Sequence, residues 1–117
     1  MKIGFIGLGN VGGKLAGSLH RNKFDLTVHD LDGAITDQFK SKGVKIAKST
    51  GDLVKDVDVV ITCLPSPKIC ANVMLGENGI LKNISKDKIW IEMSTTDQKE
   101  VIRLGKLVAE KNAVALE

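Results

Sequence analysis

The chain has 117 residues, of which 43% are hydrophobic and 26% charged, a composition typical of one globular domain and not of a disordered chain. Its net charge of +3 is mild, and three Phe and one Trp without any Tyr offer little surface for stacking nucleic-acid bases. No apolar run approaches the roughly 18 residues of a membrane span, and a strand predicted from Lys2 leaves no room for a signal segment, so we expect a cytoplasmic protein with no nucleic-acid and no membrane partner.

The first predicted strand, residues 2–7, ends in a glycine-rich turn that opens a helix over residues 11–21. In the pattern Gly7-x-Gly9-x-x-Gly12, the first glycine permits the tight turn and the second lets a pyrophosphate approach the backbone, while the third allows close packing of the helix on the sheet. The helix N-terminus then presents N–H groups and a positive dipole end to phosphate. Taken alone, these glycines also fit any tight strand-to-helix turn.

The second predicted strand, residues 24–30, supplies the acidic residue that a dinucleotide-binding unit requires. Asp30 lies eighteen residues after Gly12, a spacing that suits a carboxylate accepting hydrogen bonds from the adenosine ribose. The alternative is that Asp30 only caps a turn, although Asp32 is the better cap for a helix over residues 33–41. His29 is interpreted as a structural residue.

Strands and helices continue to alternate to the end of the sequence. The expected strands cover residues 45–47, 57–64, 88–93 and 113–116, and the expected helices cover residues 50–54, 66–75 and 97–111. The almost continuous apolar run over 57–64 is typical of a parallel strand with helices on both faces. This alternation predicts an α/β fold, a Rossmann doubly wound parallel sheet of about six strands in the order 3-2-1-4-5-6.

In such a sheet the ligand binds beyond the carboxyl ends of the strands, where the strand order reverses. The loop after the fourth strand carries Pro65 and Ser66, and the loop after the fifth carries Ser94 and Thr95. We expect both loops to approach the nicotinamide half of a dinucleotide. Alternatively, Pro65 only ends its strand, and Ser94-Thr95 only caps the helix that begins near Asp97.

Two further features have structural interpretations. Cys63 and Cys70 form no CxxC motif and have no nearby His at metal-ligand spacing, so we expect reduced thiols and no metal site. The densest basic patch is interpreted as a solvated helix end and loop, and consists of Lys40, Lys42, Lys45 and Lys48.

Four segments, residues 4–12, 63–65, 75–81 and 92–95, resemble in order and spacing the β-hydroxyacid dehydrogenases. The resemblance covers the whole chain and implies that the glycine turn binds pyrophosphate, that Asp30 binds ribose and that the later loops contact nicotinamide. The complete candidate cofactor-binding set is Gly7, Leu8, Gly9, Asn10, Val11, Gly12, Asp30, Leu31, Leu64, Pro65, Ser94 and Thr95. The family often has Met at positions 11 and 15 and Asp at position 92, where this chain has Val11, Leu15 and Glu92.

The resemblance implies an oxidoreductase that transfers hydride between a nicotinamide cofactor and a short 3-hydroxy acid of the 3-hydroxyisobutyrate or tartronate semialdehyde type. Asp30 and Leu31, with no Arg beside them, favour NAD over NADP. Family members continue into a helical domain that carries the catalytic lysine, and this sequence ends at Glu117.

We therefore expect residues 1–117 to form only the dinucleotide-binding domain. They would contain no catalytic residue, bind cofactor without turnover and self-associate through an exposed interdomain surface. A non-catalytic nucleotide-binding or sensing module is the alternative function. A methyltransferase also places an acid after its second strand, but it would normally show a different glycine pattern.

Overall fold

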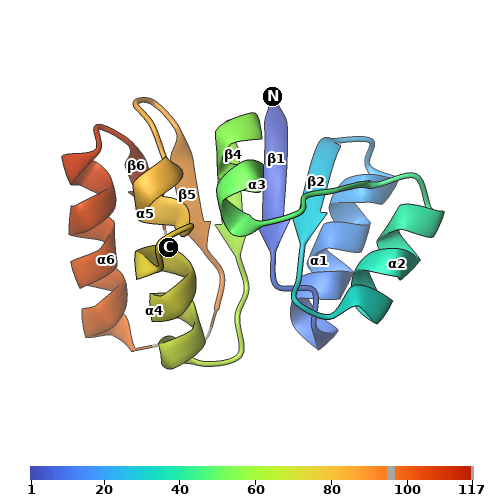
Figure 1. The fold of residues 1–117 in the computed structure, drawn as a ribbon, viewed down its shortest axis with the longest axis horizontal. Helices are drawn as coiled ribbons and strands as arrows, with labels where there is room; N and C mark the ends of the chain where they lie inside the picture. Colours follow the sequence, from blue (N-terminus) through green and yellow to red (C-terminus); the bar gives the residue numbers. More distant parts are fainter. Residues whose placement is uncertain (95–96, 117) are drawn as a thin grey trace.

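The computed structural model describes residues 1–94 and 97–116. Six parallel strands form one sheet in the order β3-β2-β1-β4-β5-β6, which confirms the predicted order (Figure 1). The strands are β1 (Lys2–Ile6), β2 (Asp25–His29), β3 (Lys45–Ile46), β4 (Val59–Thr62), β5 (Ile89–Glu92) and β6 (Val114–Leu116). β1, β2, β4 and β5 run downward in Figure 1, and because all six strands are parallel, their carboxyl ends meet at the lower edge of the molecule.

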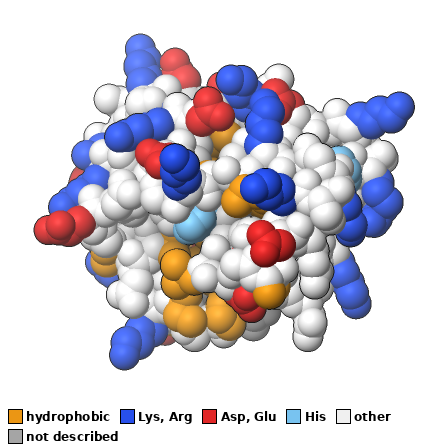
Figure 2. All heavy atoms as spheres, turned by 45° about the vertical axis from the view of Figure 1, so that its right-hand side comes forward, with side chains coloured by type: hydrophobic (Ala, Val, Ile, Leu, Met, Phe, Trp, Pro, Cys, Tyr) orange, Lys and Arg blue, Asp and Glu red, His pale blue; other side chains and the backbone are white. Residues whose placement is uncertain are grey.

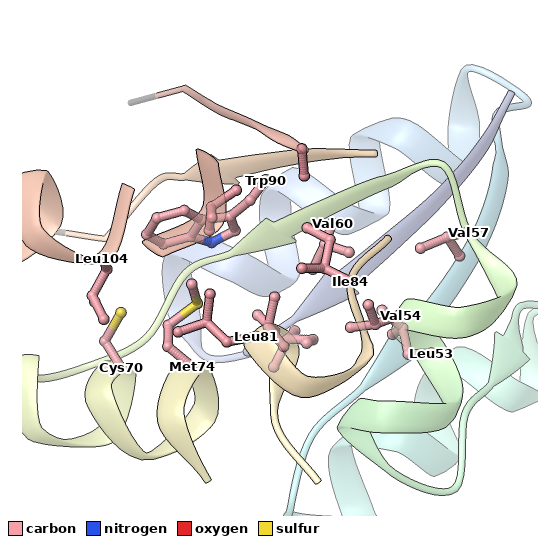
Figure 3. Close-up of a cluster of buried hydrophobic side chains, with 14 of the residues drawn as sticks. Leu53, Val54, Val57, Val60, Cys70, Met74, Leu81, Ile84, Trp90 and Leu104 are labelled. Carbon is pink, nitrogen blue, oxygen red and sulfur yellow. The ribbon is translucent and has the colours of Figure 1, made fainter. Parts of the chain in front are cut away.

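Helices cover the sheet on both faces. They are α1 (Asn10–Arg21), α2 (Gly33–Ser41), α3 (Thr50–Asp56), α4 (Pro67–Leu75), α5 (Ile80–Asn83) and α6 (Gln98–Glu110). Buried residues of α1 and α2, Ala16 and Phe39, pack in one apolar cluster with Phe5 and Val28 of the sheet. Buried residues of α3 to α6 form a second cluster around Trp90 (Figure 3). The doubly wound arrangement therefore follows from apolar residues on both faces of every central strand.

Trp90 of β5 is the largest fully buried side chain and organises the second cluster. Its indole N–H donates to the hydroxyl of Thr62, also fully buried, over 2.9 Å. Because side chains alternate along a strand, Ile89 and Ile91 face the first cluster instead. Each polar group of the Trp90–Thr62 pair thus has a partner inside the core.

The sequence did not predict α5. This helix has only four residues, too few for an apolar period of 3.6 to be recognised, and it follows the turn at residues 76–79. The described strands are also shorter than predicted: β4 ends at Thr62, although we expected it to reach Leu64. Within the described ranges, no helix is long and apolar enough to cross a membrane, and no group of three potential metal ligands occurs.

Candidate functional site

A cleft of about 650 Å³ lies at the carboxyl edge of the sheet, between the loops that follow β1 and β4. Figure 2 shows hydrophobic side chains gathered at this lower edge, whereas Lys and Arg side chains are spread over the rest of the visible face. Ten of the twelve predicted residues line the cleft: Gly7, Gly9, Asn10, Val11, Gly12, Asp30, Leu31, Leu64, Pro65 and Ser94. Thr95 lies outside the described residues.

The three glycines of the turn differ in what surrounds them. Gly7 has a φ of +98°, a conformation that side-chain-bearing residues rarely adopt, and a Cβ there would overlap the carbonyl oxygen of Cys63. A Cβ on Gly12 would overlap the carbonyl oxygen of Gly7 itself. By contrast, a Cβ on Gly9 would meet no atom within 4 Å, because it would project into open space. Gly7 and Gly12 are thus required by the turn, and Gly9 keeps the cleft open.

The N-terminus of α1 is prepared to bind an anion. Gly9 is the N-cap, and no side chain accepts a hydrogen bond there. Asn10, Val11 and Gly12 form the first turn and line the cleft, and first-turn N–H groups have no partner within a helix. Asn10 is the first helical residue and not the cap, since Gly9 occupies the N-cap position.

Asp30 connects the glycine turn to the end of β2. Its Oδ2 accepts a hydrogen bond from the N–H of Leu8 over 2.8 Å, and its Oδ1 accepts one from the N–H of Asp32 over 2.9 Å. A carboxylate has about four acceptor positions, so Asp30 keeps capacity for two further donors. The cap of α2 is Asp32, which accepts from the N–H of Ala34, as predicted.

Leu8 and Leu31 occupy opposite environments. The side chain of Leu8 is 3% exposed and packs in the first cluster, so only its backbone takes part in the turn. The side chain of Leu31 is 95% exposed at the mouth of the cleft. His29 also lines the cleft, and its Nδ1 lies 3.2 Å from the carbonyl oxygen of Ala47, which agrees with a structural role.

The loops after β4 and β5 form the other side of the cleft and are bonded to each other. The hydroxyl oxygen of Ser94 accepts a hydrogen bond from the N–H of Leu64 over 2.6 Å. Ser94 does not cap the helix that follows, because Asp97 accepts from the N–H of Lys99 as the N-cap of α6. Ser66 is the N-cap of α4, with Pro67 in its first turn.

Sequence reasoning left the direction of Glu92 open, and the structure buries this side chain beneath the cleft. Glu92 is 5% exposed, and its carboxylate accepts hydrogen bonds from the N–H of Ser94 over 2.6 Å and from the thiol of Cys70 over 2.9 Å. Burial raises the pKa of the Cys70 thiol, and the hydrogen bond to Glu92 raises it further. Alternation from Trp90 could have placed Glu92 on this face, but nothing local pointed to Cys70 as its partner.

Other lining residues were not predicted, because they lie at strand ends and in helical turns without a recognisable motif. They are Ile6, His29, Asp32, Ile35, Thr50, Cys63, Ile69, Val73 and Met93. Most are apolar, as is usual for a cofactor site in which few polar groups set the orientation of the ligand.

The raised pKa of Cys70 predicts a pH-dependent part of the stability. Because the folded-state pKa lies above the ordinary value of 9.0, the unfolded chain releases this proton first as pH rises. The protonated Cys70 thiol therefore makes its full contribution to the free energy of unfolding below about pH 9. Above that pH the contribution falls by up to about 1.4 kcal/mol per pH unit. In urea unfolding, we expect the stability of the wild type to approach that of Cys70→Ala as pH rises above about 9. Parallel pH curves for the two proteins would contradict this assignment.

Fold and site together define a dinucleotide-binding domain, since a doubly wound sheet carries an open helix N-terminus and an acidic residue at the same edge. The family model described as the NAD binding domain of 6-phosphogluconate dehydrogenase matches residues 2–117, and the chain belongs to this family. The predicted resemblance and the predicted cofactor class are thereby confirmed.

Relatives of known identity agree with this family. The mitochondrial 3-hydroxyisobutyrate dehydrogenase of Rattus norvegicus is 36% identical over 115 residues, which are 98% of this chain and 34% of that protein. The chain thus spans about a third of the length of the 3-hydroxyisobutyrate dehydrogenases it matches. Because the rat relative is named as mitochondrial, the cytoplasmic location stays a prediction.

Solved structures support the fold. Mycobacterium tuberculosis 3-hydroxyisobutyrate dehydrogenase with L-serine is 22% identical, with a TM-score of 0.85 over 97% of this chain and 38% of that chain. Psf3 in complex with NADP+ and 2-OPP is also 22% identical, with a TM-score of 0.93 over 98% of this chain and 41% of that chain.

Proposed function

We propose that residues 1–117 are the cofactor-binding part of an NAD-dependent dehydrogenase that acts on a short 3-hydroxy acid. The observation that carries this proposal is the pairing of an uncapped α1 N-terminus with the Asp30 carboxylate in one cleft. The 36% identity to 3-hydroxyisobutyrate dehydrogenase supports the substrate class. When bound, NAD supplies the hydride acceptor for the alcohol carbon of the substrate.

In this proposal, different residues of the cleft bind different parts of the cofactor. The first-turn N–H groups of α1 bind the pyrophosphate over the open side of Gly9, since no Cβ stands in the way. Asp30 accepts hydrogen bonds from the adenosine ribose with its remaining acceptor positions, beside the exposed Leu31. Leu64, Pro65 and the loop that contains Ser94 border the nicotinamide half, because they lie across the cleft from Asp30.

The same proposal assigns the surface around the cleft to contacts with the rest of the enzyme. Val11, Leu31 and Met93 line the cleft and are 63%, 95% and 47% exposed. Exposed apolar side chains that gather in one place are typical of an interaction surface. In the isolated chain this surface would favour self-association.

Cofactor choice tests the role of Asp30. We expect the chain to bind NAD at least about tenfold more tightly than NADP, because a 2′-phosphate beside Asp30 would add like-charge repulsion and remove a hydrogen bond. Isothermal titration with both dinucleotides measures the ratio. Asp30→Asn should weaken NAD binding and narrow the preference, whereas Asp37→Asn, an exposed position on α2 outside the cleft, should change neither. Equal or tighter binding of NADP by the wild type would contradict this role.

A further inference from the structure

Glu92 is a buried carboxylate to which the proposed function has so far given no role. It ends β5, is 5% exposed, and forms no ion pair with any Lys, Arg or His in the part of the chain that the structure describes. A buried carboxylate without a cationic partner depends on hydrogen bonds to satisfy its oxygens. The two donors of Glu92 therefore determine where its side chain lies.

The two donors come from different elements. Oε1 accepts from the backbone N–H of Ser94 in the loop after β5, and Oε2 accepts from the thiol of Cys70 on α4. Cys70 is 1% exposed, and Figure 3 shows its sulfur directed into the core beside Leu104. Glu92 thus joins the packed side of α4 to a loop that lines the cleft.

The hydrogen bonds continue from Ser94 across the cleft wall. The Ser94 hydroxyl accepts from the N–H of Leu64, the residue before Pro65, over 2.6 Å. The N–H of Met93, the residue before Ser94, donates to the carbonyl oxygen of Thr62 over 2.8 Å. This second hydrogen bond holds the start of the loop after β5 against the end of β4. A continuous series of contacts therefore runs from Cys70 through Glu92 and Ser94 to Leu64.

We propose that Glu92 is a positioning residue for the nicotinamide half of the cofactor: anchored on Cys70, it orients Ser94 so that the loops after β4 and β5 form one rigid wall of the cleft. This inference rests on the proposed function, which places nicotinamide on that side. Glu92 lies beneath the wall and does not line the cleft, so it acts through Ser94 and not by contact with the cofactor. An aspartate would be one methylene shorter and would not span Ser94 and Cys70 in the same way.

The pyrophosphate and ribose contacts lie on other elements, so Glu92 should affect only part of the cofactor. The experiment compares NAD with ADP-ribose, which lacks nicotinamide, for the wild type, Glu92→Ala and Glu92→Gln by isothermal titration. In Glu92→Ala we expect the Kd for NAD to rise about tenfold and the Kd for ADP-ribose to stay within about twofold. The fluorescence enhancement of NADH on binding, which reports the surroundings of its nicotinamide, should fall in parallel.

Two further variants separate positioning from general damage. Glu92→Gln should restore NAD binding to within about threefold of the wild type, because its amide oxygen still accepts from Ser94. Glu77→Ala, a matched removal of an exposed carboxylate outside the cleft, should leave both ligands unaffected. If Glu92→Ala unfolds, Glu92→Gln and Ser94→Ala still test the inference. Ser94→Ala should weaken the binding of NAD more than that of ADP-ribose, and Glu92→Gln should not.

The outcomes separate this inference from the proposed function. If the wild type binds neither NAD nor ADP-ribose, the proposed function is wrong and the inference falls with it. If the wild type binds both and the Glu92 or Ser94 variants weaken both ligands equally, or weaken neither, the proposed function stands and Glu92 is not a positioning residue.

Discussion

Substituting Gly9 and Gly12 should have different effects: Gly9→Val should abolish NAD binding in a folded protein, and Gly12→Val should destabilise the fold. At Gly9 the φ of −66° is open to any residue, and a Cβ would meet nothing within 4 Å, so the valine would fill the space proposed for the pyrophosphate. The cost in stability should be about 1 kcal/mol, because valine is a poorer N-cap than glycine.

At Gly12 the added side chain would overlap the carbonyl oxygen of Gly7, and the aromatic ring of Phe5 lies within contact distance. A backbone atom in a tight turn cannot move aside as a flexible side chain could. We expect a loss of about 3 kcal/mol or more, which lowers the Tm by roughly 10 °C or more. Differential scanning calorimetry and NAD titration on both variants, with Gly33→Ala as a control outside this turn, measure the two effects. Equal melting of both variants, or NAD binding by Gly9→Val, would contradict this division.

The fold was predictable because its determinants are local and repeated. Apolar runs alternate with helical segments, and glycines or helix caps mark the turns, as Asp32 shows by capping α2 where the sequence placed it. The topology then follows from general rules for parallel sheets. α5 was missed because four residues carry no periodic signal, and its packing against α3 and α4 is a property of the folded chain.

The site was predictable where a motif fixes geometry and not where it depends on tertiary partners. The spacing from Gly12 to Asp30 placed both residues in one cleft, since it reflects one strand–helix–strand unit. Leu8 adjoins the glycines, yet its side chain packs in the core because the chain turns there. Alternation along β5 could place Glu92 on the Trp90 face, but its bond to Cys70, 22 residues away in sequence, is a property of the folded chain.

The isolated chain should bind NAD and still fail to oxidise any 3-hydroxy acid. Removing hydride from an alcohol carbon requires a group that takes the hydroxyl proton, and a positioned general base contributes roughly 10²- to 10⁴-fold to such a rate. Within the described residues no lysine lines the cleft: Lys14 and Lys68, on α1 and α4, are exposed outside it. His29 lies beside Asp30 on the side proposed for adenosine, and its Nδ1 faces the carbonyl of Ala47.

The missing general base is not the only reason to expect a low rate of hydride transfer. On the side proposed for nicotinamide, the cleft is bordered by the exposed Met93, so we expect a bound nicotinamide to stay open to water, with neither positioning of substrate nor exclusion of solvent complete. The measurement is NADH formation by the 117-residue chain with 3-hydroxyisobutyrate and with glycerate, in samples where titration has already established NAD binding. The Gly9→Val variant serves as the control for cofactor-independent background. NAD-dependent oxidation of either acid above that background would mean that the proton acceptor lies within these residues, and that the catalytic lysine proposed for the rest of the enzyme is not needed.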